Sequence, residues 1–413
     1  MSSQVYSQNY VGKGGRLVSV ITSDPSRYSV PVSCLAGVFE EAQVHLPYGF
    51  VKPTISGCKD VGVAGTGREQ STGRPLFWAL SGDRPFFWAT PATKSTTFDL
   101  GASAGVEILK VGHYPGELIL RNMPTSTRLG IVGTTHRLEV QVKPEDTDNM
   151  LDVVIAGINQ TVALSGISNV HMLVWSASKV TLDSRSLKFL SIEGARDLDL
   201  SIPQGGMERL EDISAARATG QLKFSAEQTR PLTMAGSQGP NVIKLGGEGD
   251  VILVTGDVDD VVYTGAGNDY VRTGKGDDVI SPGAGRNFVE TGTGHDVVVI
   301  ARAEHSVLPS VKEKMLTTIT DFDPANDILR FAFLREGRLL DHDRTLTLEQ
   351  EVATSNATTL EDAAATMRAH MNTNEVAALH WDGITYVLVD NAEQTTVRLH
   401  GVVDIQPDSI TFG

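Results

Sequence analysis

The chain has 413 residues, of which 40% are hydrophobic and 21% are charged, and its mean hydropathy is -0.08. This composition excludes a disordered chain and a membrane-spanning one, and the length suits two or three domains. Fifty acidic and 35 basic residues give a net charge of -15. That charge opposes binding to nucleic-acid phosphates and favours cations, so we expect no nucleic-acid partner.

Residues 1–145 are expected to form an N-terminal β-rich domain whose role stays open among anchoring, an interface and ligand binding. Segments such as 16–22 and 137–142 alternate or run apolar between Gly, Pro and Ser breaks. Residues 74–79 recur ten positions later as 84–89, with Phe-Trp-Ala at the end of each copy. This repeat predicts an aromatic hairpin, which we interpret as core or interface, with a glycan-binding surface as the alternative.

Two features of this region bear on the compartment of the protein. The first residues lack the basic segment and apolar stretch of a secretory signal peptide, so we expect any export to use another route. Cys34 and Cys58 form neither a disulfide framework nor a zinc-binding spacing, and whether they are bonded stays open.

A hydrolase motif also lies in this region. Residues 101–105 read Gly-Ala-Ser-Ala-Gly, which matches G-x-S-x-G with Ser103 as nucleophile and His113 or His136 as base. The nucleophile elbow requires a helix after the serine, whereas 106–111 is rich in β-branched residues. We therefore expect no enzyme, and a secreted serine hydrolase is kept as an alternative.

Residues 146–240 contain short apolar segments at intervals near 18 residues. They begin at 162, 180 and 198, and a fourth follows at 222 after a longer step. Strands that recur in this way predict the coils of a parallel β-solenoid, in which each coil buries its apolar side chains only by stacking on the next. The alternative is a β-sandwich with coincidental spacing.

The spacing tightens to nine residues between positions 256 and 300. Five blocks follow one another: GDVDDVVYT, GAGNDYVRT, GKGDDVISP, GAGRNFVET and GTGHDVVVI. The fifth position of each block is acidic or an amide, namely Asp260, Asp269, Asp278, Asn287 and Asp296. A shorter unit at 246–252, which contains Asp250, and a degenerate copy at 239–243 precede the blocks.

This pattern predicts stacked, oxygen-lined turns. Glycines permit tight turns, and the apolar pair after each Asp or Asn predicts a short strand. If two blocks form one coil, turns 256–260, 274–278 and 292–296 share one edge, and turns 247–250, 265–269 and 283–287 share the other. Carboxylates and glycine carbonyls then surround each gap, and this donor set suits calcium. Residues 245–300 hold ten acidic and three basic side chains, so we expect calcium to drive the folding of this region.

The blocks resemble the G-G-x-G-x-D-x-U-x nonapeptides of the repeats-in-toxin (RTX) family, whose parallel β-roll binds calcium between its turns. The resemblance implies carboxylate ligands at Asp260, Asp269, Asp278 and Asp296. It also implies turn glycines or carbonyl donors at Gly256, Gly265, Gly267, Gly274, Gly276, Gly292 and Gly294. Asp250 and Asn287 are further candidate calcium-site residues, although the short unit, Asn287 and Val258 depart from the family pattern.

The C-terminal region also resembles this family. Residues 318–329 are similar to the segment that caps the repeats, so Asp321 and Asp327 are expected to complete a last ion site, with a plain turn as the alternative. A helix over 360–371, a hairpin over 377–391 and a strand over 397–404 are predicted next. Together they resemble the C-terminus of type I secreted proteins, which carries an uncleaved export signal.

These predictions combine into an all-β chain: a parallel β-solenoid and RTX β-roll with an N-terminal β domain and a C-terminal β cap that contains one helix. The expected divisions are 1–145, 146–240, 241–300 and 301–413. The resemblance implies a type I secreted structural protein that binds several Ca2+ ions, most like bacterial surface-layer (S-layer) proteins. It would form a cell-surface layer or an adhesive subunit at the bacterial cell surface.

The expected partners are further copies of the chain, a type I exporter, and a cell-surface glycan or lipopolysaccharide bound by the N-terminal domain. A virion structural protein, such as a tail or capsid decoration, is the alternative outside this class.

Overall fold

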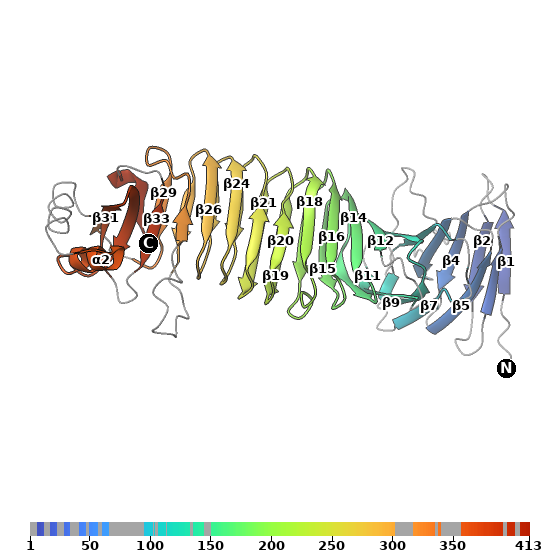
Figure 1. Ribbon diagram of the computed structural model, residues 1–413. Helices are drawn as coiled ribbons and strands as arrows, with labels where there is room; N and C mark the ends of the chain where they lie inside the picture. Colours follow the sequence, from blue (N-terminus) through green and yellow to red (C-terminus); the bar gives the residue numbers. More distant parts are fainter. Residues whose placement is uncertain are drawn as a thin grey trace. The chain divides into compact units, whose positions relative to one another are not determined.

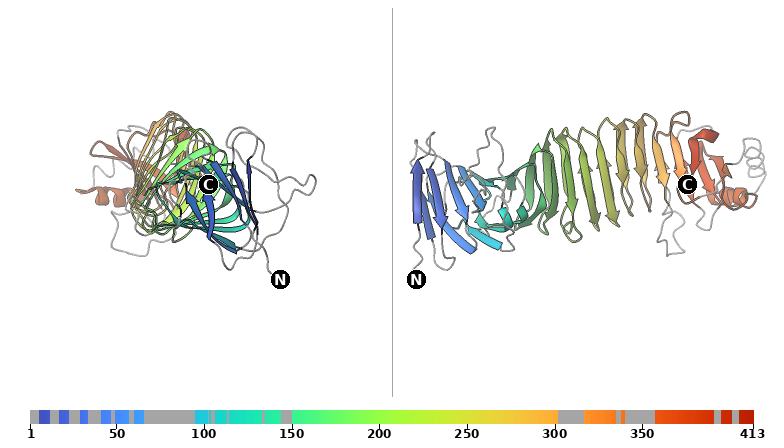
Figure 2. Two further views of the ribbon diagram at one scale, coloured as in Figure 1. Left: turned by 90° about the vertical axis from the view of Figure 1, so that its right-hand side faces the viewer. Right: turned by 180° about the vertical axis from the view of Figure 1, so that it is seen from behind.

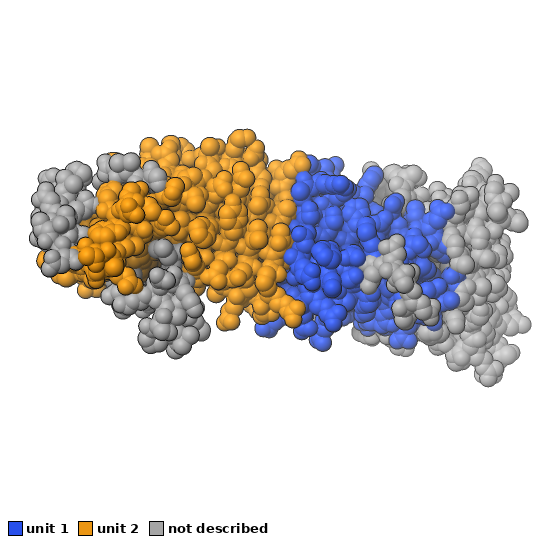
Figure 3. Space-filling model, viewed as in Figure 1, with its two compact units in different colours: residues 1–220 blue, residues 221–413 orange. Residues whose placement is uncertain are grey.

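The chain is described by a computed structural model. It covers the backbone of six strands between Tyr6 and Gly65, and residues 95–413 except 102, 104–105, 113, 133–134, 144–149, 302–316, 335–337, 340–356, 391–394 and 401–404. The two cysteines, the aromatic repeat at 74–89 and His113 lie outside the described residues. The chain divides into two compact units, residues 1–220 and 221–413 (Figure 3).

Unit 1 is a parallel β-solenoid in which each strand from β2 onward pairs with the strand two places along the chain (Figure 1). One ladder contains β2 (Leu17–Thr22), β4 (Glu41–Leu46), β6 (Asp60–Gly65), β8 (Ile108–Val111), β10 (Arg128–Val132), β12 (Met150–Ala156), β14 (Asn169–Ser176), β16 (Phe189–Gly194) and β18 (Asp212–Ala218). The other contains β3 (Ser29–Ser33), β5 (Gly49–Ser56), β7 (Ser95–Asp99), β9 (Tyr114–Met123), β11 (Thr135–Val142), β13 (Asn159–Ser165), β15 (Ser178–Asp183) and β17 (Leu198–Ile202). The first strand, β1 (Tyr6–Val11), is antiparallel to β2.

The coils of unit 1 are longer than the sequence spacing suggests. Val162 pairs with Leu182, and Val180 pairs with Leu200, so each coil advances by 20 residues here rather than by 18. Alternate side chains of these strands are buried, which places one apolar row per strand inside the coil. The expected boundary at residue 145 falls inside the ladders, because β10 and β11 pair with β12 and β13 across it.

The segment around Ser103 does not form a nucleophile elbow. Ser103 is buried, with 6% of its surface exposed, and its backbone N–H donates to the carbonyl oxygen of Leu100 in the turn after β7. The next element is strand β8, whereas an elbow requires a helix at this point. Ser103 therefore lies in a connection between two strands rather than at a strand-to-helix elbow.

Unit 2 contains shorter coils, whose strands are coloured yellow to orange in the right-hand view of Figure 2. One ladder contains β20 (Leu232–Ala235), β22 (Val251–Val254), β24 (Tyr270–Lys275), β26 (Phe288–Thr293) and β28 (Thr317–Ile319). The other contains β19 (Leu222–Gln228), β21 (Asn241–Gly247), β23 (Val261–Tyr263), β25 (Val279–Ser281), β27 (Val297–Ile300), β29 (Ile328–Phe331) and β34 (Ile410–Phe412).

The interior of unit 2 is a column of aliphatic side chains. Ile243, Val262, Ile280 and Val298 lie directly above one another in the ladder that contains β21, and all four are fully buried. The register between Val262 and Ile280 is 18 residues, as the nine-residue blocks predict. The predicted fold class, an all-β parallel β-solenoid, is confirmed.

A small mixed sheet and one helix follow the coils in unit 2. Strand β33 (Thr396–Leu399) pairs in parallel with β28 and antiparallel with β32 (Ile384–Val389), which forms a hairpin with β31 (Glu375–Trp381). A two-residue strand, β30 (Arg338–Leu339), pairs with β31, and the short 3-10 helix η1 (Pro407–Ser409) precedes β34. Helix α2 (Leu360–Arg368) starts at the N-cap Thr359, whose side chain accepts the N–H of Asp362. The predicted helix and hairpin are therefore present.

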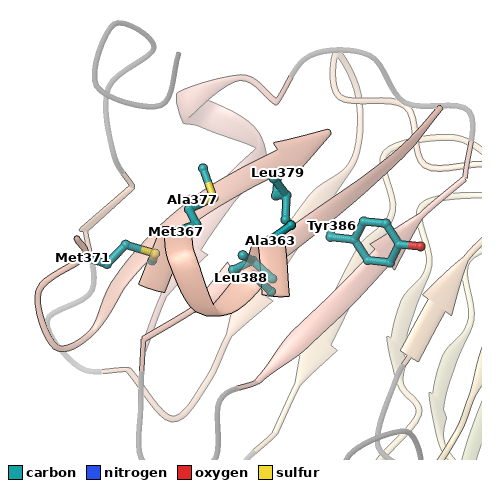
Figure 4. Close-up of a cluster of buried hydrophobic side chains, with 8 residues drawn as sticks. Ala363, Met367, Met371, Ala377, Leu379, Tyr386 and Leu388 are labelled. Atoms are coloured by element: carbon teal, nitrogen blue, oxygen red, sulfur yellow. The ribbon is translucent and has the colours of Figure 1, made fainter. Parts of the chain in front are cut away.

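Helix α2 packs on the hairpin through a separate apolar cluster (Figure 4). Ala363 and Met367 from the helix, with Met371 three residues beyond its end, meet Leu379 and Leu388 from the two strands. All five side chains are buried. This cluster, rather than the helix alone, holds α2 in place, because a nine-residue helix is marginal in water.

The cluster predicts the effect of a truncation in the hairpin. Replacing Leu388 by Ala removes a fully buried side chain, and we expect a loss of about 2–5 kcal/mol from the stability of this cap. Hydrogen exchange of β31 and β32 should report the loss, and Thr373→Ala, at an exposed position, is the matched control. Unchanged exchange in Leu388→Ala would show that the helix does not depend on this cluster.

Candidate metal centre

The turns of the nonapeptide blocks stack on two edges of unit 2. Edge A contains the turns 256–260, 274–278 and 292–296, and edge B contains 247–250, 265–269 and 283–287. On edge A the backbone N–H of Asp260 donates to Oδ1 of Asp278 over 2.8 Å, and the N–H of Asp278 donates to Oδ1 of Asp296 over 2.9 Å. Each bond joins residues 18 apart, so alternate blocks stack as the spacing predicts.

Four carboxylates inside these turns have one oxygen without a partner. Asp260, Asp269, Asp278 and Asp296 are each at most 1% exposed. In all four, Oδ1 accepts a backbone N–H of the preceding coil. In all four, Oδ2 is buried and has no hydrogen-bond partner. A buried carboxylate oxygen without a donor is costly. A positive group beside this oxygen would therefore stabilise each of these turns.

The glycines of one turn lie against carbonyl oxygens of the stacked turn before it. Gly292 has a φ of +101°, and a Cβ added there would lie 1.6 Å from the carbonyl oxygen of Gly274. On edge B, a Cβ on Gly283 would lie 1.6 Å from the carbonyl oxygen of Gly265. Only glycine fits at such positions. The carbonyl oxygen of one turn therefore lies against the glycine of the next turn.

A second, outer ladder joins the same turns in the opposite direction. Oδ1 of Asp259 accepts the N–H of Asp277, and Oδ1 of Asp277 accepts the N–H of His295, both over 2.9 Å. On edge B, Asn268 likewise accepts the N–H of Arg286 over 3.1 Å. This ladder is not among the predicted features, although its signal is visible in the sequence as the polar residue that precedes each buried Asp or Asn.

Threonines form a third ladder that the sequence analysis also missed. The hydroxyl of Thr255 donates to the carbonyl oxygen of Thr273 over 3.2 Å, and the hydroxyl of Thr273 donates to the carbonyl oxygen of Thr291 over 2.7 Å. On edge B, Thr264 donates to the carbonyl of Pro282 over 3.0 Å. The signal was Thr at the last position of three of the five blocks.

Two predicted site residues lie elsewhere than expected. Asp250 is exposed and accepts the N–H of Asn268 over 2.7 Å, so it belongs to the outer ladder. The buried position beneath Asp269 is occupied by Val251, whose N–H donates to Oδ1 of Asp269. Asn287 is buried in the expected row, where its Oδ1 accepts the N–H of Asp269 over 3.0 Å.

The last two predicted residues cap the stack. Asp321 accepts the N–H groups of Thr291 and Gly292, one on each carboxylate oxygen and both over 2.9 Å. Asp327 accepts the N–H of Asp296 on Oδ1 over 3.1 Å and that of Asp323 on Oδ2 over 2.8 Å. Their carboxylates therefore pair with backbone donors, in contrast to the four buried aspartates of the blocks.

Burial controls the titration of the carboxylates. It raises the pKa of Asp278 to about 7, and the neighbouring carboxylates Asp260 and Asp296 add to this rise. Burial likewise raises the pKa of Asp269 to about 6 and that of Asp327 to about 6. The pKa values of Asp260 and Asp296 are raised for the same reason. Without a cation, burial therefore shifts these side chains toward the protonated form.

The donor set fits calcium. Within the described part of the chain, no three His, Cys, Asp or Glu side chains gather around one point, so carbonyl oxygens must complete any ligand shell. Calcium accepts such mixed shells of carboxylate and carbonyl oxygens, whereas zinc prefers nitrogen and sulfur. The residues that would hold it are Asp260, Asp269, Asp278 and Asp296, with the carbonyl groups of the stacked turns.

Comparison with known families agrees with this geometry. Two overlapping segments, residues 254–289 and 263–298, match the RTX calcium-binding nonapeptide repeat in four copies. The chain therefore carries RTX repeats and is a calcium-binding β-roll protein. A search of curated proteins gave no match to this chain. No helix among the described residues is long and apolar enough to cross a membrane.

The stacked turns predict that a methyl group at a turn glycine disrupts the roll. Gly292→Ala forces a side chain into a positive-φ conformation and against the carbonyl of Gly274, so we expect a loss of about 1–3 kcal/mol from the backbone alone. The midpoint of a calcium titration followed by circular dichroism should rise. The exposed neighbour Thr293 supplies the control Thr293→Ala, and equal midpoints for both variants would contradict the stacking argument.

The raised pKa values predict opposite pH dependences with and without calcium. In its calcium-free form the roll binds more protons than the unfolded chain between about pH 4 and about pH 7, so its stability falls as pH rises through this range. Calcium binds the ionised carboxylates, so its affinity rises over the same range. Thermal unfolding with chelator and calcium titration, each at about pH 5 and about pH 7.5, measure the two trends. Parallel trends would contradict this assignment.

Proposed function

We propose that this calcium-binding β-roll protein is an extracellular structural protein, exported by a type I system and assembled at a bacterial cell surface as a layer or an adhesive subunit. The observation that carries the proposal is the row of buried carboxylates with unpartnered Oδ2 atoms at positions 260, 269, 278 and 296. Such a row makes the folding of the roll from residue 256 onward conditional on calcium.

Conditional folding suits a protein that acts outside the cell. Ionised carboxylates stacked in a desolvated row repel one another, and binding of a cation to the folded form alone would shift the equilibrium toward it. Calcium is scarce in the cytoplasm and abundant outside, so the chain would stay unfolded until export. Proteins that carry RTX repeats are typically secreted, which agrees with this order of events.

The C-terminal region is proposed to contain the export signal. It comprises α2 and strands β31 to β33, which follow the β-roll as in the resemblance to type I secreted proteins. We assign contacts with neighbouring copies, with a cell-surface glycan or with lipopolysaccharide to the N-terminal region. An extended parallel solenoid offers repeated surfaces for such contacts.

The function is tested by calcium titration of the full chain, followed in parallel by circular dichroism and sedimentation. We expect calcium to induce β-structure and, above a threshold, large ordered assemblies that a chelator dissolves. The monomer should unfold locally in unit 2 when calcium is removed, because its carboxylates then lose their counter-ion.

Each outcome changes the assignment in a defined way. Folding with calcium but without assembly would replace the layer by an adhesin or another secreted protein. An assembly with unchanged circular dichroism in chelator would overturn the calcium-gated structural function. Esterase activity lost in Ser103→Ala would establish the hydrolase instead.

A further inference from the structure

Asn287 places an amide where other turns of the row have a carboxylate. Like the buried aspartates, it uses Oδ1 to accept a backbone N–H of the preceding coil, in this case that of Asp269. This bond identifies the oxygen of the amide, because a backbone N–H only donates. The atom in the place of Oδ2 is therefore Nδ2, and it donates to the carbonyl oxygen of Gly283 in its own turn over 3.3 Å.

The first turn of edge A contains a second such residue. The turn 237–241 lies beneath 256–260, since the N–H of Asn241 donates to Oδ1 of Asp260 over 2.7 Å and a Cβ on Gly256 would lie 2.9 Å from the carbonyl oxygen of Ser237. Asn241 is 1% exposed, and it occupies the position that Asp occupies in the later turns.

The amide nitrogen of Asn241 is surrounded by oxygen. It lies 2.9 Å from Oδ1 of Asp260, 2.9 Å from the carbonyl of Gly239 and 3.1 Å from that of Ser237. Its own Oδ1 accepts the N–H of Ser237 over 2.8 Å, so the orientation of the amide is fixed. A group that only donates thus sits between two turns, among carboxylate and carbonyl oxygens of the kinds that a calcium ion would bind.

Edge B begins in a similar way. Gln228 is 1% exposed, and its Nε2 donates to the carbonyl oxygen of Gly249 over 2.7 Å. Gly249 stacks directly beneath Gly267, because a Cβ on Gly267 would lie 2.6 Å from its carbonyl oxygen. Both edges therefore start with a buried side-chain amide that donates into the oxygen-rich face of a turn.

We propose that the buried amides of Asn241, Asn287 and Gln228 replace calcium in their turns, so that these turns close without an ion and calcium is required only where Asp260, Asp269, Asp278 and Asp296 occupy the row. The inference rests on calcium binding by the β-roll. It divides unit 2 into an ion-independent start and an ion-dependent continuation. The coils before residue 256 would then offer a folded end onto which calcium adds the later coils.

A reciprocal pair of substitutions tests the proposal. Asp278→Asn keeps the Oδ1 acceptor and supplies an amide, so this variant should bind one calcium ion fewer than the natural chain and melt at a higher temperature in chelator. Asn287→Asp should bind one ion more, melt lower in chelator and recover in excess calcium. Isothermal titration calorimetry counts the ions, and circular dichroism gives the melting temperatures.

Alanine supplies the matched control. Asn287→Ala removes both the amide and the Oδ1 acceptor, so it should lower the melting temperature equally with chelator and with calcium. Asn241→Asp should lower it only in chelator, since a second carboxylate would then face Asp260.

Two failures are distinguishable. If the natural chain binds no calcium, the proposed function fails, whereas the chelator measurements still test the amides. If the natural chain binds calcium but Asp278→Asn melts lower than it in chelator, the amide replacement is wrong and the calcium-dependent function stands. The same holds if Asn287→Asp does not recover in excess calcium.

Discussion

The β-roll depends on one arrangement: a buried carboxylate that gives one oxygen to the backbone of the coil below and leaves the other oxygen buried without a hydrogen-bond partner. The first oxygen fixes the coils at the correct spacing, as the bonds of Asp260 and Asp278 to their neighbours show. The second is costly unless a positive group joins it. Stability and ion dependence therefore have the same source, and neither can be removed by substitution without changing the other.

The two edges of the roll differ in how many of their turns contain a buried carboxylate. Edge A has buried carboxylates in all three of its turns, followed by the cap at Asp327, whereas edge B has Val251, Asp269 and Asn287 in succession. The outer and threonine ladders join the turns on both edges without any ion. The buried carboxylates without a partner on Oδ2 thus lie mainly on edge A, while hydrogen bonds from side chain to backbone are present on both edges.

Much of this site is predictable from the sequence, because glycine spacing decides where the turns fall and the nine-residue period decides which turns stack. The stacking of Asp260, Asp278 and Asp296 needed no other information. Asp250 was misplaced because it precedes two apolar residues as Asp269 does, although the pairing of Ile252 with Tyr270 places Val251 in the row. The contacts of Asn241 are not predictable, since they depend on which way an amide points inside an irregular turn. The sequence spacing predicts 18-residue coils in unit 1 instead of the observed 20, because no glycine pattern marks their turns.

A strict repeat does not by itself determine which of its coils pair with each other. From residue 256 to residue 300 each coil presents equivalent strands and turns. A shift of the pairing register by one whole coil would therefore again stack apolar residues on apolar residues and turns on equivalent turns. The pairing register must therefore be determined by segments whose sequence occurs only once in the roll. These are the 19-residue step from Asn241 to Asp260 at the start, and the bonds from Thr291 and Gly292 to Asp321 at the end. The irregular ends of the roll therefore determine which of several equally good pairings its regular middle adopts.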